Sequence, residues 1–127
     1  MDYNVLETRS ADILTKYYNN EIDSFLNACH EDILWIGPAE KHVIRTRKAL
    51  VDAFSKEDHK LEFVLSDLNV FSVGLTESSC EVIMFFILDT IWPDSSVGRA
   101  NQRIQFTWVS ENGEKKIKLC HISNAIK

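Results

Sequence analysis

A histidine and a serine stand two residues apart near the end of the chain, as His121 and Ser123 in the run HISNAI. Near neutral pH an imidazole can donate and accept hydrogen bonds, and a hydroxyl does both at any pH. Positions two apart in a strand share a face. Strand alternation therefore predicts that both side chains point the same way as Ile117 and Leu119, at the end of a mostly apolar face.

A second polar set precedes this segment, where Arg103, Gln105 and Thr107 alternate with three large apolar residues. The alternation predicts a strand with one polar and one apolar face. Three interpretations of the arginine remain open: it is solvated, it forms a salt bridge across a dimer, or it pairs with the carboxylate of a ligand. Asp89, near the end of the run MFFILD, is either a buried acid or the point where a strand leaves the core.

The sequence lacks the short motifs of nucleophilic, zinc or phosphate-binding sites, since GxSxG, HExxH, GxxxxGK and GxGxxG are all absent. Cys29, Cys80 and Cys120 are far apart and have no CxxC spacing, so we expect buried, reduced thiols. Nothing in the spacing of the four histidines predicts that they meet around a metal. We therefore expect neither a metal nor a cofactor.

Size and charge limit the class of protein. The 127 residues predict one domain, spanning 1–127, with a core of its own. The net charge of −5 argues against a nucleic-acid partner. No apolar run approaches the roughly 20 residues of a membrane span, and the first residues lack the order of a signal peptide. We expect no membrane partner and a cytoplasmic location.

The apolar periodicity changes from 3.6 residues to two near Lys60. Before that point it predicts a helix that begins in a capping box of Asn4 and Glu7, a second helix over 22–29, and a third capped by Thr46. The strand-like segments, separated by turn signals such as Asn112-Gly113, are DILWIGP, HVIR, LEFVLSDLNVFSV, SCEVIMFFILDTIW, RANQRIQFTWVS and KKIKLCHISNA. This order predicts an α+β domain in which all helices precede the long strands.

The predicted sheet is long-stranded, and one of its central strands, EVIMFFIL, is apolar on both faces. Strands of ten or more residues exceed the usual length, so we expect the sheet to curl and to contain bulges. One apolar face packs on the helices, and the other needs a second cover. A partner subunit is the simplest cover, so we expect a homodimer formed through the sheet.

The element order, together with the segments LWIGP, RTRKALVDAF, QRIQFTWV and CHISNAI, resembles the nuclear-transport-factor-2-like superfamily, and within it bacterial SnoaL-like and ketosteroid-isomerase-like domains. The resemblance implies three N-terminal helices packed on a strongly curved antiparallel sheet, which forms a cone with an internal pocket. It also implies a homodimer. Members of this superfamily include isomerases, cyclases and dehydratases, and others that only bind ligands or partners. Some relatives with a similar ending resemble sensory modules of longer proteins.

The resemblance also implies roles for single residues. The isomerases carry a catalytic aspartate just before a proline at the end of the first strand, where this chain has Gly37. Their oxyanion donor is a tyrosine of the first helix, for which Tyr17 is the candidate, while Tyr18 is expected in the core. Trp35 shares a face with Gly37, and either lines a pocket beside the missing side chain or fills the core. The expected pocket residues are Trp35, Gly37, Tyr17, Arg103, His121 and Ser123.

Two functions follow as hypotheses. The first is a non-catalytic small-molecule-binding or sensory domain with a mainly apolar pocket, which is favoured because Gly37 cannot act as a base. The second is an isomerase, cyclase or dehydratase that uses His121 and Tyr17 instead. For His121, a structural tie between the sheet and the first helix and a role in ligand recognition both remain open. The sequence names no ligand.

Overall fold

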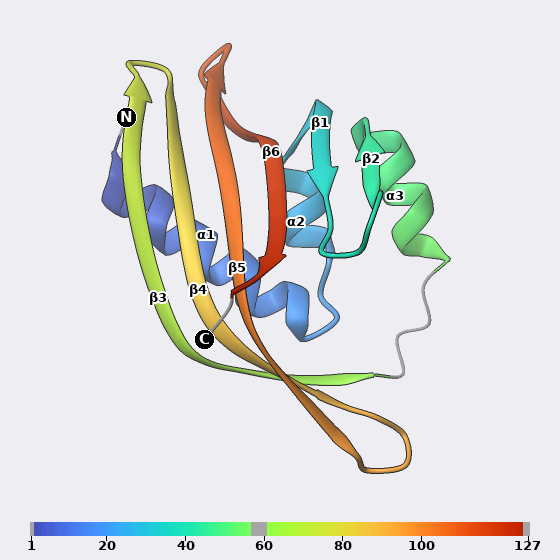
Figure 1. The fold of residues 1–127 in the computed structure, drawn as a ribbon. Helices are drawn as coiled ribbons and strands as arrows, with labels where there is room; N and C mark the ends of the chain where they lie inside the picture. The colour runs from blue at the N-terminus through green and yellow to red at the C-terminus, as the bar shows by residue number, and fades with distance from the viewer. Residues whose placement is uncertain (1, 57–60, 126–127) are drawn as a thin grey trace.

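The computed structural model describes residues 2–56 and 61–125, and within these ranges it contains three helices and six strands (Figure 1). In chain order the elements are α1 (Tyr3–Tyr18), α2 (Asp23–Ala28), β1 (Cys29–Ile36), β2 (Val43–Arg45), α3 (Arg47–Ser55), β3 (Glu62–Thr76), β4 (Ser79–Ile91), β5 (Val97–Glu111) and β6 (Glu114–Asn124). The described helices all precede residue 60, so the predicted α+β organisation is confirmed. Lys60 itself, where the periodicity changes, lies outside the described residues.

The six strands form one sheet in the order β2-β1-β6-β5-β4-β3. Strands β3 to β6 are successive antiparallel hairpins, as predicted. At the turn between β5 and β6, Asn112 and Gly113 both have a positive φ, as the predicted two-residue hairpin turn requires. Strand β1 departs from the expected all-antiparallel sheet, because it pairs parallel to β6 and antiparallel to β2. The direction of this long-range pairing has no signal in the local sequence pattern.

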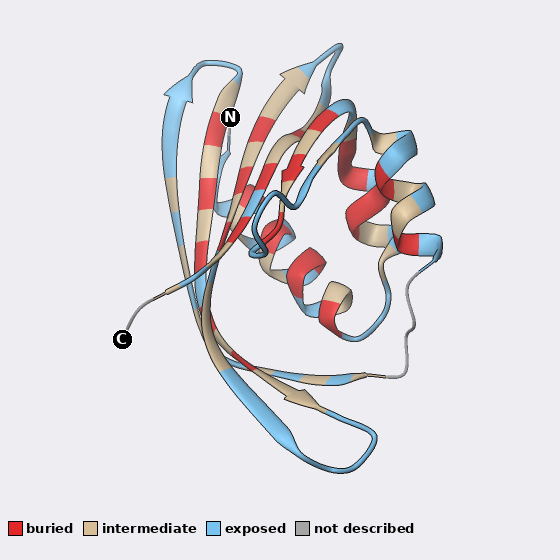
Figure 2. Ribbon diagram, turned by 45° about the vertical axis from the view of Figure 1, so that its right-hand side comes forward, coloured by how far each residue is buried: buried red, intermediate tan, exposed pale blue. Residues whose placement is uncertain are grey.

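The sheet curls around the helices without closing on itself, and the helices lie on its concave side (Figures 1 and 2). Along β4 and the second half of β5, buried residues alternate with exposed or intermediate ones (Figure 2). Since the helices cover the concave side, the buried row is the one that faces them. On β4 the inward row Val82, Met84 and Phe86 is at most 3% exposed, whereas the outward Phe85 is 36% exposed. We call these two sides the inner face and the outer face.

Bulges accompany the curl, as predicted. In β3 the register shifts between Ser66 and Asn69, and Asp67 between them has a φ of 54°. In β6 the register shifts at Lys118, because Ile117 and Leu119 face two consecutive residues of β5. Each extra residue changes which side chains point inward from that point on.

The N-terminal caps of α1 and α3 can be compared with the caps predicted from the sequence. Thr46 caps α3 as predicted, since its hydroxyl accepts a hydrogen bond from the Ala49 amide at 3.2 Å. The capping box expected at Asn4 is wrong, because Asp2 is the N-cap of α1 and accepts from the Val5 amide. Glu7, the other half of the expected box, instead accepts a hydrogen bond from the Ser72 hydroxyl of β3. None of the described helices is long and apolar enough to cross a membrane.

Candidate functional site

The space between the helices and the inner face is almost filled by side chains. A cavity of about 10 Å³ remains there, which is room for about one water molecule. Its lining is apolar and aromatic and comes from α1, α2, β1, β5 and β6. The lining residues are Ile13, Leu14, Tyr17, Phe25, Trp35, Ile104, Phe106, Cys120 and Ile122. We call this space the inner cavity.

Trp35, one of the residues that line the inner cavity, carries an unsatisfied polar group. The side chain comes from β1 and is 4% exposed, with its ring edge-on to those of His42 at 4.6 Å and Phe54 at 5.9 Å between centroids. Its Nε1 is buried and has no hydrogen-bond partner among the described residues. A buried donor without a partner is costly, so it marks a position where an acceptor would be stabilised.

Gly37 lies under the same ring. A Cβ built on Gly37 would stand 2.4 Å from His42 Nδ1 and 2.7 Å from Trp35 Cη2. The space beside the missing side chain is therefore occupied by Trp35 and His42, and is not open as the first of the two interpretations of Trp35 required. Of the two interpretations of Trp35, its ring fills the core over Gly37, and the same residue also lines the inner cavity.

The two adjacent tyrosines take different positions. Tyr17 lines the inner cavity and packs its ring against Phe25 and Phe54, with centroids 5.6 and 5.8 Å apart. Tyr18 belongs to the core, as predicted, and its hydroxyl donates to Gln102 Oε1 at 3.2 Å. Burial raises the pKa of Tyr18 well above its usual value, so the phenol stays neutral.

Sequence reasoning missed the polar chain that begins at Tyr18. Gln102 of β5 accepts from Tyr18 and donates through Nε2 to Asn124 Oδ1 at 3.2 Å. Strand alternation places Gln102 in the same inward row as Ile104, because each pairs with an inward residue of β4. A polar residue in an otherwise apolar inward row was the signal that would have found it.

His121 and Ser123 lie on the outer face, which corrects the expectation that they point toward the helices. The bulge at Lys118 inverts the strand: Ile117 is fully buried on the inner face, whereas Leu119, His121 and Ser123 share the outer face. His121 is exposed. Its side chain therefore does not tie the sheet to α1.

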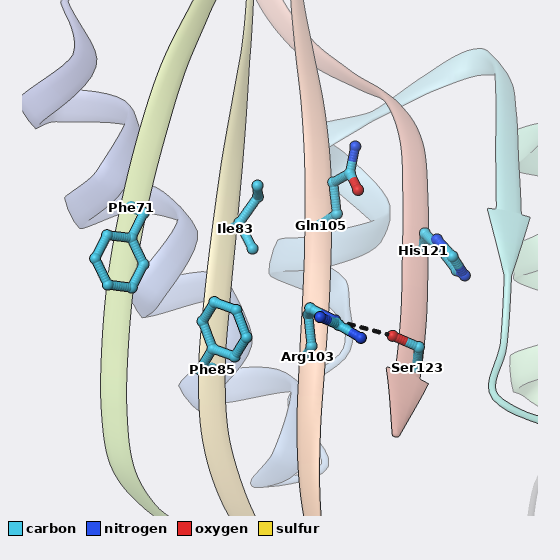
Figure 3. A pocket seen from close by; sticks show the side chains of 7 residues that line it. All are labelled: Phe71, Ile83, Phe85, Arg103, Gln105, His121 and Ser123. Carbon is cyan, nitrogen blue, oxygen red and sulfur yellow. Dashed lines mark hydrogen bonds between the residues drawn. The ribbon is translucent and has the colours of Figure 1, made fainter. Parts of the chain in front are cut away.

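His121 and Ser123, together with residues of β3, β4 and β5, form a groove of about 490 Å³ on the outer face (Figure 3). Figure 3 shows the guanidinium of Arg103 turned toward Ser123, and the Arg103 Nε donates to Ser123 Oγ at 3.4 Å. The Arg103 Cζ also lies 5.7 Å from the ring centroid of Phe85. The residues of this outer groove are Phe71, Ile83, Phe85, Arg103, Gln105, His121 and Ser123.

The six expected pocket residues therefore separate into two groups. Three of them, Tyr17, Trp35 and Gly37, lie at or beside the inner cavity. The other three, Arg103, His121 and Ser123, line the outer groove. Because the sheet stands between Tyr17 and His121, these two side chains cannot act on one substrate. That rules out the particular acid–base pair of the catalytic hypothesis.

The other candidates for chemistry are accounted for by local contacts. Asp89 forms a two-point ion pair with Arg99 at 2.8 and 3.0 Å, and these hydrogen bonds lower the pKa of Asp89. The three cysteines are buried free thiols, as predicted. Burial raises the pKa of Cys29 to about 12, so this thiol is not a ready nucleophile. Residues 2–56 and 61–125 hold no cluster of three or more potential metal ligands.

Comparison with known proteins identifies the fold. No family model matches the chain, and no curated protein matches it. A ketosteroid isomerase-like protein from Erwinia carotovora superposes with a TM-score of 0.83 at 13% identity, covering 98% of this chain and 96% of that one. ActVI-ORFA from Streptomyces coelicolor gives 0.75 at 11% identity, covering 96% of each chain.

A third similar solved structure is described as NTF2-like. An NTF2-like protein of unknown function from Pseudomonas putida gives a TM-score of 0.66 at 11% identity, covering 98% of this chain and 89% of that one. These likenesses extend over nearly the whole chain at identities that establish the fold and leave the activity open. The chain has the fold of the nuclear-transport-factor-2-like superfamily.

Proposed function

We propose that this protein is a non-catalytic binding domain that holds a small, mainly apolar molecule in the inner cavity. The observation that carries the proposal is Trp35, whose side chain lines the apolar inner cavity and whose buried Nε1 has no described hydrogen-bond partner. The ligand contributes a hydrogen-bond acceptor, such as a carbonyl oxygen, which takes the indole N–H. At about 10 Å³ the cavity holds little, so the lining side chains move apart when a larger ligand binds.

The chemistry of the lining supports binding over catalysis. No carboxylate or imidazole is among the residues that line the inner cavity, and the position that carries an aspartate in isomerases is Gly37. Cys120, the one thiol of the lining, is fully buried, and burial raises its pKa well above the usual value. A neutral indole N–H orients an acceptor, but it does not remove a proton from carbon.

We also propose that two copies associate through the outer face. Large apolar side chains are exposed there, including Phe71 at 57% and Val73 at 48%, next to Ile83 and Phe85. An apolar patch of this kind on one side of a sheet favours a protein partner. All three cysteines are buried thiols, the form favoured in a reducing compartment, which supports a cytoplasmic location.

Matched probes test the binding proposal. Cyclohexanone and methylenecyclohexane have nearly the same shape, and only the ketone accepts a hydrogen bond. We expect the wild type to bind the ketone more tightly, and we expect Trp35→Phe to remove this preference. One hydrogen bond contributes about 0.5–1.5 kcal/mol, so the ketone-to-alkene affinity ratio should fall by about two- to tenfold. The ratio is measured by thermal shift and by ligand-observed NMR.

The control variant is Trp92→Phe. Trp92 is 48% exposed, so its replacement should leave the ratio unchanged. Equal affinities of the wild type for ketone and alkene, or a ratio that survives Trp35→Phe, would contradict the proposal.

A further inference from the structure

The outer groove contains a cation but no anion. Arg103 is charged at neutral pH, and no aspartate or glutamate is among the residues that line the groove. The apolar wall of the groove comes from Phe71, Ile83 and Phe85. Whatever covers this surface must bring apolar side chains for the wall and a carboxylate for Arg103, because a desolvated guanidinium without an acceptor is unfavourable.

The same face of the same chain carries a suitable carboxylate. Glu81 lies on β4, two positions from Ile83 and on the same side of the strand. Among the described residues Glu81 has no ion pair, and it accepts a hydrogen bond of 3.4 Å from the Thr107 hydroxyl. The outer face thus offers a positive and a negative side chain separated by an apolar strip.

The register places these two charges symmetrically. Along β4 and β5, Glu81 pairs with Thr107, Ile83 pairs with Gln105, and Phe85 pairs with Arg103. Glu81 and Arg103 therefore lie on opposite sides of the Ile83–Gln105 pair, two positions away in each direction. In a twofold dimer, if residue i of one copy contacts residue j of the other, then j also contacts i. A twofold axis near the Ile83–Gln105 pair can therefore place Arg103 of each copy opposite Glu81 of the other copy.

We propose that the occupant of the outer groove is a second copy of this chain, placed so that Arg103 of each copy forms an ion pair with the partner's Glu81. This inference rests on the proposed homodimer and specifies its contacts. The apolar residues Phe71, Ile83 and Phe85 are buried between the two copies. The two ion pairs fix the register, because a shifted register leaves both cations and both anions without partners.

Charge reversal tests the pairing. Arg103→Glu alone places two carboxylates opposite each other in the homodimer, and Glu81→Arg alone places two cations opposite each other. We expect each variant to be shifted to the monomer, with a dimer dissociation constant at least tenfold above that of the wild type. When the two variants are mixed, each contact again joins opposite charges. We therefore expect the mixture to form a heterodimer, detected by native mass spectrometry and sedimentation velocity.

Formation of the heterodimer would also show that both variants are folded. Asp89→Arg serves as the matched control, because Asp89 already pairs with Arg99 of its own chain, and this change should leave the dimer intact. A wild type that is monomeric at micromolar concentration would contradict both the homodimer and the pairing. A dimeric wild type whose two charge-reversed variants also stay dimeric, or fail to associate when mixed, would contradict the pairing alone.

Discussion

Replacing Trp35 by alanine is expected to lower the free energy of unfolding by about 3–5 kcal/mol, as buried tryptophan-to-alanine changes do. The side chain is 4% exposed and packs edge-on against Phe54. Its removal joins the space of the indole ring to the inner cavity. The loss is measured by denaturant unfolding of the wild type and the variant.

The enlarged cavity provides a second readout. Free indole fits the space that the Trp35 side chain leaves, and a ligand that binds only the folded state stabilises it. We expect millimolar indole to raise the melting temperature of Trp35→Ala and to leave the wild type unchanged. Trp92→Ala is the control, because this exposed residue should change stability by about 0.5 kcal/mol or less. A Trp35→Ala variant as stable as the wild type would show that the ring does not fill the core.

Gly37→Asp is expected to destabilise the fold and to confer no isomerase activity. The new Cβ meets Trp35 Cη2 at 2.7 Å and His42 Nδ1 at 2.4 Å. His42 is exposed and can turn away, but Trp35 is held by its packing. Overpacking of this kind costs about 1–3 kcal/mol, and a carboxylate buried beside an indole adds to the loss. Denaturant unfolding measures the change.

An exposed glycine near the start of β5, Gly98, provides the comparison for Gly37→Asp. A Cβ on Gly98 has Trp92 Nε1 as its nearest neighbour at 3.7 Å, an ordinary contact. Gly98→Ala should therefore change stability far less than Gly37→Ala. If Gly37→Asp kept full stability and catalysed the isomerisation of an enolisable ketone, the site would have room for a base. The conclusion that Trp35 and His42 fill the space beside Gly37 would then be incorrect.

The strength of the local signals explains which parts of the fold were predictable. Helical periodicity ends before the long strands, and the cap at Thr46 and the turn at Asn112–Gly113 depend on a few adjacent residues. Such signals act over one turn, so the sequence pattern records them directly. The α+β order of elements and the hairpins of β3 to β6 follow from them.

The placement of the candidate site was only half predictable, and one bulge accounts for the error. A single extra residue at Lys118 reverses the faces of the last strand segment, moving His121 and Ser123 to the outer face. The bulge depends on pairing with β5, and the sequence pattern of β6 alone carries no mark of it. Likewise, the way Trp35 covers Gly37 depends on its rotamer and on packing against α3.

The indole region of a ¹H–¹⁵N NMR spectrum shows whether the Trp35 N–H lacks an acceptor in the protein and gains one from a ligand. The three tryptophans have distinct N–H environments: Trp108 donates to Ser10 Oγ at 2.9 Å, Trp92 is exposed, and Trp35 is buried without a described partner. Single Trp→Phe variants assign the three signals. The Trp35 signal should be protected from exchange and lie upfield of that of Trp108. On addition of cyclohexanone it should move downfield while the other two stay fixed. A Trp35 signal already in the hydrogen-bonded position in the free protein, or one that ignores the ketone, would contradict the account.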